Sequence, residues 1–362
     1  MFKNLLLSFI SLLLFSVIFF SGLNFLLGGV PLFGMFKIDI EEMVYVLKND
    51  DKEKYKNIVE TKNFHYRLSR CGKRENGFVN LLYKEDRFGF RNDNEDLYFS
   101  TDFVILGDSF GIGSCVNYPY DLTSQLKKKF NNNKFLNLSV AGTGPFYQKE
   151  LFETLMSKTN TKYKTLIWFF YEGNDHEDIN INFNKELNFA LERPIKRSWE
   201  TFRSDKEDFF VNYFPLKNIH IIKLKIYLAN YFRGFGTLAK YLKNFPPLIN
   251  SEKNYESLIE NFNEYLINNK IENKIIYYIP KYTRLTYKNI NHPQLNQLDS
   301  LKNFIKKTAI KNNFDFIDGS AFFHNRIEPL DIFYYDLPTH FNEKGYNLLA
   351  EHLKIEYDKL KK

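Results

Sequence analysis

Residues 103–110 read FVILGDSF, and this stretch decides the fold. Its first four residues are apolar, the length of a short buried strand, and Gly107-Asp108-Ser109 ends the run at once. Apolar runs of similar length recur at residues 135–138, 165–170, 275–279 and 314–317. Helical patterns alternate with them, at about residues 121–130, 146–158, 254–269, 296–312 and 343–359. This alternation predicts parallel strands joined by helical crossovers, and therefore an α/β fold: a three-layer α/β/α sandwich with a five-stranded parallel sheet.

The composition excludes several classes of protein. The 362 residues are 44% hydrophobic and 26% charged, as in an ordinary globular chain and unlike a disordered or multi-pass membrane protein. The formal net charge of +7 is not gathered into a basic tract with a nucleic-acid motif, so we expect no nucleic-acid partner. Two cysteines cannot form a four-thiolate zinc site, and no pair of His or Cys has metal-ligand spacing. We therefore predict neither a metal nor any other cofactor.

The N-terminal residues 1–36 have the properties of a membrane anchor. Residues 4–36 contain no charged side chain, and the apolar centre at residues 5–27 exceeds the roughly 20 residues that span a bilayer. No small-residue cleavage site of the signal-peptide kind follows, so we expect an uncleaved transmembrane helix. Lys3 precedes the helix, whereas Lys37 is soon offset by acidic residues, and the positive-inside rule then favours a cytoplasmic N-terminus. The rest of the chain would lie outside the cytoplasm, in a periplasmic or extracellular space.

This expected location bears on the cysteines. Disulfides persist in oxidising compartments. A single disulfide between Cys71 and Cys115 is therefore a hypothesis, which mass analysis of non-reduced peptides tests.

The remaining chain divides into two parts. Residues 37–100 are polar and weakly periodic, and we expect them to pack on the core, with residues 86–91 (DRFGFR) as a structured loop that leads into it. The domain at residues 101–360 carries an insertion at about residues 176–253, because this gap between strands is far longer than a usual connection. Within the insertion, residues 220–245 alternate apolar and basic positions at helical spacing. They indicate a helical hairpin packed on the core, which we favour, or an amphipathic lid at the membrane surface.

Gly107-Asp108-Ser109 alone is a common tripeptide, but three further blocks occupy matching places along the chain. They are NLSVAGTGP at residues 137–145, EGND at residues 172–175 and DLPTHFN at residues 336–342. Together the four blocks resemble those of the SGNH hydrolase superfamily, also called the GDSL esterases and lipases. The resemblance covers about residues 86–175 and 272–358. It implies a flavodoxin-like sheet with acyl-ester chemistry at the carboxyl ends of its strands, where open parallel sheets bind their ligands.

The resemblance assigns Ser109 as the nucleophile and His340 as its base. A serine hydroxyl needs a base to remove its proton, and His340 lies in a loop that leads into the last helix. A carboxylate should accept the other imidazole N–H, and Asp336 is the nearest candidate. In the family the acid commonly stands three residues before the histidine, whereas Asp336 stands four before it. The sequence therefore leaves open a longer loop, another acid such as Asp331, or a Ser-His dyad helped by a backbone carbonyl.

The tetrahedral intermediate of an ester reaction carries an oxyanion, which preorganised donors stabilise. By resemblance these donors are the backbone N–H groups of Ser109 and Gly142 and the side-chain amide of Asn174. At Gly142, a side chain would hinder the approach of the backbone to a substrate. We expect Asp108 to hold the serine turn by accepting a local N–H.

Two groups near the expected site have alternative roles. Arg91 either binds an anionic group of the substrate or forms a salt bridge that pins its loop, and we favour the salt bridge. Tyr277, Tyr278 and Tyr282 lie at the end of the fourth strand, where they either stack on sugar rings or belong to the core.

These residues support three functional hypotheses. In the leading one, the protein is a serine hydrolase of acyl esters: an esterase or deacetylase of cell-envelope glycan or lipid that forms an acyl-serine intermediate. If a sugar hydroxyl rather than water receives the acyl group, the protein is an O-acyltransferase of surface polysaccharide. A single helix forms no channel for an acyl donor, so this alternative needs a multi-pass partner. In the third hypothesis the fold is a non-catalytic glycan-binding module, which the shifted position of Asp336 favours.

Overall fold

A computed structural model of the protein describes residues 11, 15, 64–69, 79–86, 90–92, 100–131, 133–159, 161–176, 252–286, 293–326, 331–333 and 340–362. The expected anchor at residues 1–36, apart from two isolated positions, lies outside these ranges, as do residues 177–251 of the expected insertion. Within the described ranges, no helix has both the length and the apolar character needed to cross a bilayer.

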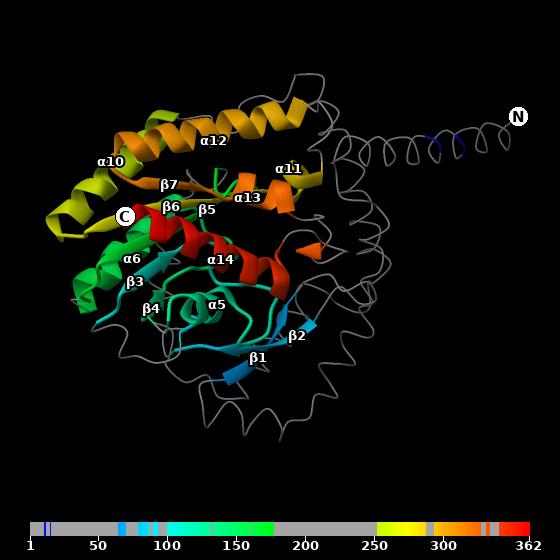
Figure 1. Ribbon diagram of the computed structural model, residues 1–362, viewed down its shortest axis with the longest axis horizontal. Helices are drawn as coiled ribbons and strands as arrows, with labels where there is room; N and C mark the ends of the chain where they lie inside the picture. Colours follow the sequence, from blue (N-terminus) through cyan, green and yellow to red (C-terminus); the bar gives the residue numbers. More distant parts are fainter. Residues whose placement is uncertain are drawn as a thin grey trace, which may run out of the picture.

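The centre of the fold is a five-stranded sheet in the order β4-β3-β5-β6-β7. Its strands are β3 (Phe103–Leu106), β4 (Phe135–Asn137), β5 (Thr165–Tyr171), β6 (Asn273–Ile279) and β7 (Asp315–Asp318). Every neighbouring pair is parallel, so the carboxyl ends of the strands lie along one edge (Figure 1). The predicted parallel α/β sheet is confirmed, and each predicted strand begins and ends within two residues of an observed one.

Helices connect the strands and cover both faces of the sheet. The helices that correspond to predicted ones are α5 (Leu122–Lys129), α6 (Pro145–Thr159), α10 (Glu252–Asn268), α12 (Pro293–Lys311) and α14 (Glu343–Leu360). The sequence did not predict α11 (Tyr282–Thr286) or α13 (Gly319–Arg326). The five residues of α11 are too few for an apolar stripe to repeat, whereas α13 has eight residues, as many as α5, and the sequence analysis missed it.

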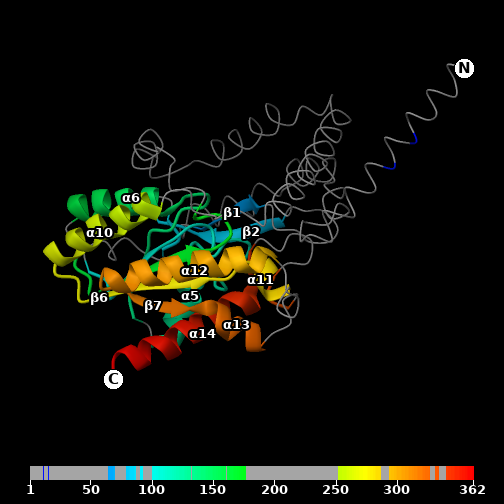
Figure 2. The ribbon, with the colours of Figure 1, turned by 90° about the horizontal axis from the view of Figure 1, so that it is seen from above.

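Successive side chains of the strands enter two separate cores. All seven side chains of β5 are buried, as expected for a parallel strand covered on both faces. Trp168 packs in the core that α6, α10 and α12 cover. The next residue, Phe169, packs in the core that α5, α13 and α14 cover. Figure 2 shows α6 and α10 on one side of the sheet and α13 and α14 on the other.

A second, two-stranded sheet precedes the main one. It pairs β1 (Phe64–Ser69) with β2 (Val79–Lys84) in antiparallel register. The backbone N–H of Leu82 donates to Oδ1 of Asn117 (2.8 Å), and the N–H of Tyr118 donates to the carbonyl of Leu82 (2.8 Å), so the hairpin contacts the loop that follows Ser109. The strand sequence FHYRLS alternates apolar and polar residues, and VNLLYK does so except at Leu82. The sequence analysis described residues 37–100 as weakly periodic and predicted no strands there, so it missed this short alternation.

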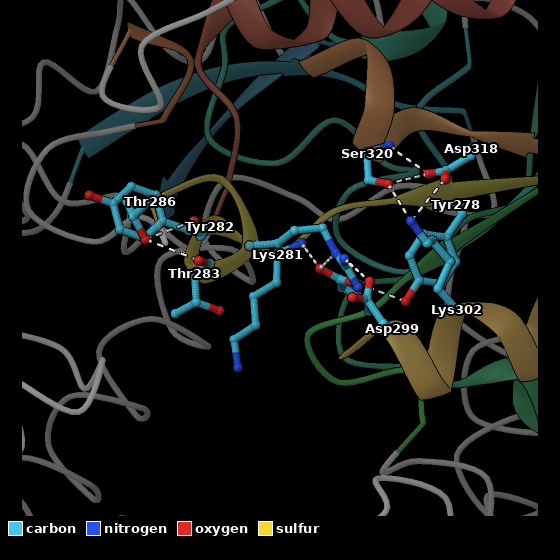
Figure 3. A network of polar contacts seen from close by, with 11 residues as sticks. Tyr278, Lys281, Tyr282, Thr283, Thr286, Asp299, Lys302, Asp318 and Ser320 are labelled. Atoms are coloured by element: carbon cyan, nitrogen blue, oxygen red, sulfur yellow. Dashed lines mark hydrogen bonds and ion pairs between the residues drawn. The ribbon is translucent and has the colours of Figure 1, made fainter. Parts of the chain in front are cut away.

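A buried ion pair joins the carboxyl ends of β5 and β6. Glu172 directly follows β5 and is completely buried. Its carboxylate accepts hydrogen bonds from the hydroxyl of Tyr278 (2.7 Å), the backbone N–H of Lys281 (2.8 Å) and Nε of Arg284 (2.9 Å). Nη1 of Arg284 also donates to Asp299, 2.5 Å away, and Figure 3 shows Tyr278, Lys281 and Asp299 gathered around this network. Burial lowers the pKa of Arg284, but the charge of Glu172 together with the hydrogen bonds to Glu172 and Asp299 outweighs this effect and holds the pKa above its ordinary value, so the arginine stays charged.

We predict that Glu172→Gln lowers the free energy of unfolding by about 3–5 kcal/mol, because the buried charge of Arg284 loses its main partner. Chemical denaturation of the full-length chain measures this loss. Asp358→Asn is the matched control, since Asp358 pairs with Lys354 on the surface, where a pair contributes about 0–1 kcal/mol. Equal losses in the two variants would contradict a stabilising role for the buried pair.

Candidate active site

The turn after β3 presents Ser109 at the carboxyl edge of the sheet. Oδ1 of Asp108 accepts a hydrogen bond from the backbone N–H of Phe110 (2.8 Å), which confirms that Asp108 holds the turn. The carbonyl of Asp108 accepts a second bond, from the N–H of Ile112 (3.0 Å). Asp108 is buried, whereas Ser109 is partly exposed. The serine hydroxyl is therefore held in a defined turn and remains accessible.

The imidazole of His340 lies against this hydroxyl. Nε2 of His340 is 2.8 Å from Oγ of Ser109, although the two residues are 231 positions apart in the chain. For the serine to donate in this contact, Nε2 must be unprotonated and the ring proton must be on Nδ1. Burial lowers the pKa of His340 to about 4. At neutral pH the ring is therefore uncharged and able to accept a proton.

The start of α14 positions His340. Asn342 caps this helix, because its Oδ1 accepts a hydrogen bond from the backbone N–H of Gly345 (3.0 Å). In the first turn of the helix, the hydroxyl of Tyr346 donates to the carbonyl of Ser114 (3.1 Å), in the loop that follows Ser109. The helix that carries the base and the loop that carries the nucleophile are thus bonded directly to each other.

The predicted acid, Asp336, lies outside the described residues. Asp331, the alternative acid, is half-exposed, and its carboxylate lies 3.0 Å from Nζ of Lys344. Its backbone carbonyl accepts a hydrogen bond from Nδ2 of Asn342 (2.8 Å). Asp331 therefore supports the start of α14, which disfavours it as the partner of the imidazole. A triad with Asp336 and a Ser-His dyad remain the two forms of the site.

Gly142 and Asn174 lie in the turns after β4 and β5, the two neighbours of β3. Gly142 has a φ of +75°, a left-handed conformation that favours glycine. No neighbouring atom of the residues that the structure describes would lie within 4 Å of a Cβ there, so it is the left-handed backbone conformation that favours glycine. Among the described residues, no acceptor pairs with the backbone N–H of Ser109 or Gly142. These two donors and the partly exposed Asn174 are the candidates for an oxyanion hole.

Arg91 has neither of its two expected roles. Its side chain is buried, and the guanidinium stacks on the ring of Tyr83 at 3.8 Å. Nη1 donates to the carbonyl of Gly113, and Nη2 donates to the carbonyl of Val116 (2.7 Å). Within the described part of the chain, no carboxylate forms a salt bridge with it. Arg91 therefore pins the loop that follows Ser109 through backbone carbonyls, and its donors are not directed at a substrate.

Two buried asparagines, to which the sequence analysis assigned no role, connect this loop to β4. Oδ1 of Asn92 accepts from the backbone N–H of Asn137 (2.7 Å), and its Nδ2 donates to Asp86 (2.7 Å). Nδ2 of Asn137 in turn donates to the carbonyl of Gly111 (2.9 Å). These hydrogen bonds thus link Asp86 and Asn92 to the loop that follows Ser109, through the end of β4. The available signals were the position of Asn92 directly after FGFR and the polar side chain of Asn137 within the apolar run at residues 135–138.

The other residues singled out in the sequence are three tyrosines and two cysteines. Tyr277 and Tyr278 are completely buried within β6 and belong to the core, while Tyr282 is half-buried in α11. Cys115 is disulfide-bonded, and Cys71, its expected partner, lies outside the described residues. Among the described residues, no cluster of His, Cys, Asp and Glu could hold a metal ion.

Comparisons with known proteins give matches in structure only. No family model and no curated protein matches the sequence. One similar solved structure is a lipase/acylhydrolase from Enterococcus faecalis, with 13% identity and a TM-score of 0.38 over 70% of this chain and 94% of that chain. Another is a catalytic mutant of an acetylxylan esterase from Geobacillus stearothermophilus, with 14% identity and a TM-score of 0.36 over 71% of this chain and 93% of that chain. A third is a psychrotrophic esterase from Pseudoalteromonas sp., with 12% identity and a TM-score of 0.37 over 72% of this chain and 98% of that chain. Likenesses at these TM-scores carry no weight for function, which has to be inferred from the residues of this chain.

We predict that Arg91→Lys lowers the free energy of unfolding by about 2–4 kcal/mol, because an ammonium group cannot bond both carbonyls and stack on Tyr83 at once. Chemical denaturation measures the loss, and Lys307→Arg, on the exposed face of α12, is a control expected to change stability by less than about 0.5 kcal/mol. Unchanged stability of Arg91→Lys, together with weaker binding of an anionic ester, would restore the substrate-binding role.

Proposed function

We propose that this protein is a serine hydrolase of acyl esters. The observation that carries the proposal is the 2.8 Å contact between Nε2 of His340 and Oγ of Ser109 at the carboxyl edge of the sheet. A neutral imidazole can remove the hydroxyl proton, and the serine is accessible to a substrate. A glycan-binding module would need no such pair, so the contact favours an enzyme over the non-catalytic alternative.

In the proposed reaction, Oγ of Ser109 attacks the ester carbonyl carbon while Nε2 of His340 removes the hydroxyl proton. The N–H groups of Ser109 and Gly142, with the amide of Asn174, stabilise the negative charge on the former carbonyl oxygen. His340 then protonates the leaving alkoxide, and an acyl-serine remains. Water, deprotonated by the same imidazole, attacks the acyl carbon, the carboxylic acid leaves, and Ser109 recovers its proton.

We further propose that the substrate is an acylated glycan or lipid of the cell envelope, with the domain held outside the cytoplasm by residues 1–36. The uninterrupted apolar run of the N-terminus supports this location. In the alternative, an O-acyltransferase, a sugar hydroxyl replaces water in the second step and a multi-pass partner supplies the acyl group. An acceptor sugar that diverts the acyl group from water during turnover distinguishes the two.

We predict that Ser109→Ala lowers turnover of p-nitrophenyl acetate by at least about 1,000-fold, because the acyl intermediate can no longer form. A fluorophosphonate probe should label the wild-type chain once, as measured by intact mass, and leave the variant unlabelled. Ser157→Ala, on the exposed surface of α6, is the matched control and should keep both properties. Equal turnover and labelling in Ser109→Ala and the wild type would overturn the proposal.

We predict that kcat/KM falls as the pH decreases through about 4, and not through 6.5, the ordinary pKa of histidine. Only the neutral imidazole accepts the proton of Ser109, so activity is retained above the pKa of the folded protein and lost below it. A pH-rate profile measures this limb, and circular dichroism at each pH distinguishes protonation from unfolding. An acid limb near 6.5 would contradict this prediction and would indicate a carboxylate on Nδ1 that raises the pKa of the buried imidazole.

A further inference from the structure

The residue that follows the nucleophile has its ring against the base. Phe110 is 1% exposed. Its ring centroid lies 5.3 Å from that of His340, at an interplanar angle of 32°. The ring of Phe341, the residue after His340, packs edge-on against the ring of Phe110, with centroids 5.1 Å apart. The peptide that carries the nucleophile therefore also supplies the surface on which the imidazole rests.

Phe110 also contacts Tyr171, which packs against the turn that carries Asn174. The ring of Tyr171, the last residue of β5, stacks on Phe110 with centroids 4.0 Å apart and an interplanar angle of 29°. A Cβ added to Gly173 would lie 2.2 Å from Cε1 of Tyr171, so the backbone beside Asn174 packs directly on the same ring. The backbone N–H of Tyr171 donates to the carboxylate of Asp175 (2.8 Å), which closes the turn.

We propose that Phe110 and Tyr171 are positioning residues, whose stacked rings set the plane of the His340 imidazole and the height of the Gly173-Asn174 turn relative to Ser109. The inference rests on the proposed function and adds to it a reason for aromatic residues at these two places. An aliphatic side chain could fill the same volume, but aromatic rings pack with preferred offsets and tilts, and so restrict the orientation of a neighbouring imidazole. Neither residue touches the reacting atoms, so both act through the groups that do.

The test compares kcat and KM for p-nitrophenyl acetate in matched variants of the full-length chain. Phe110→Leu keeps an apolar side chain and removes the ring. We expect kcat to fall by about 10- to 100-fold, as for a misplaced catalytic group, with KM within about twofold of wild type. Tyr171→Leu should behave in the same way, whereas Tyr171→Phe, which keeps the ring, should recover most of the lost kcat.

Phe103→Leu is the control for a simple loss of packing. Phe103 is buried in the same core at the opposite end of β3, where its ring stacks on Phe135 at 4.6 Å. We expect this variant to lose stability like Phe110→Leu and to keep the kcat of the wild type. The melting temperature of each variant shows that its fold is intact at the assay temperature.

The outcomes separate this inference from the function on which it rests. If the wild type neither turns over the ester nor reacts with a fluorophosphonate, the proposed function fails. If the wild type is active and Phe110→Leu and Tyr171→Leu keep its kcat, only the positioning role is overturned. If Phe110→Leu does not fold, the comparison of Tyr171→Phe with Tyr171→Leu decides, and equal kcat values in that pair would refute the stack.

Discussion

Parallel pairing of β3 with β4 on one side and β5 on the other is the constraint on which the site depends. Parallel strands end at the same edge, so the turns that carry Ser109, Gly142 and Asn174 have to be neighbours. Burial of both faces enforces the register of this pairing. A shift of β5 by one residue would move Trp168 and Phe169 into each other's core, and each close-packed core would have to repack around a side chain of different size.

Apolar packing orients the strands, but it cannot define the loops beyond them, because it has no directional preference. Buried polar groups perform that task here. Arg91 bonds two carbonyls of the loop after Ser109, and the amides of Asn92 and Asn137 connect that loop to β4. Glu172, directly after β5, bonds to Tyr278 of β6 and forms an ion pair with Arg284 in the segment that follows β6. Each group has lost its hydration, so each bond within the protein replaces water that is no longer available. These hydrogen bonds therefore fix the loops relative to the ends of the strands.

The surroundings of His340 determine what kind of base it is. Burial keeps the imidazole neutral, so it is available to accept a proton throughout the neutral and mildly acidic range. A base of low pKa is also a weak one, and it gains less from removing the serine proton. Donors that stabilise the oxyanion then have to contribute more to lowering the barrier. A carboxylate on Nδ1 would raise the pKa and strengthen the base. If Asp336, four residues before His340, supplied this carboxylate, it would therefore set the strength of the base as well as its orientation.

The sequence by itself determined the parallel sheet, five of the helices described above and the residues of greatest chemical interest, because periodicity and turn residues are local properties. Apolar runs of strand length indicate burial on two faces, and the Gly107-Asp108-Ser109 turn that follows such a run places the serine at a strand end. Tertiary structure alone decided what those residues meet. The contact between Ser109 and His340, the use of Arg91 as a loop clamp and the stack of Phe110 on Tyr171 all join segments distant in the chain. Such contacts follow from how whole layers pack, and for segments this far apart in the chain the local sequence pattern does not specify which of them meet.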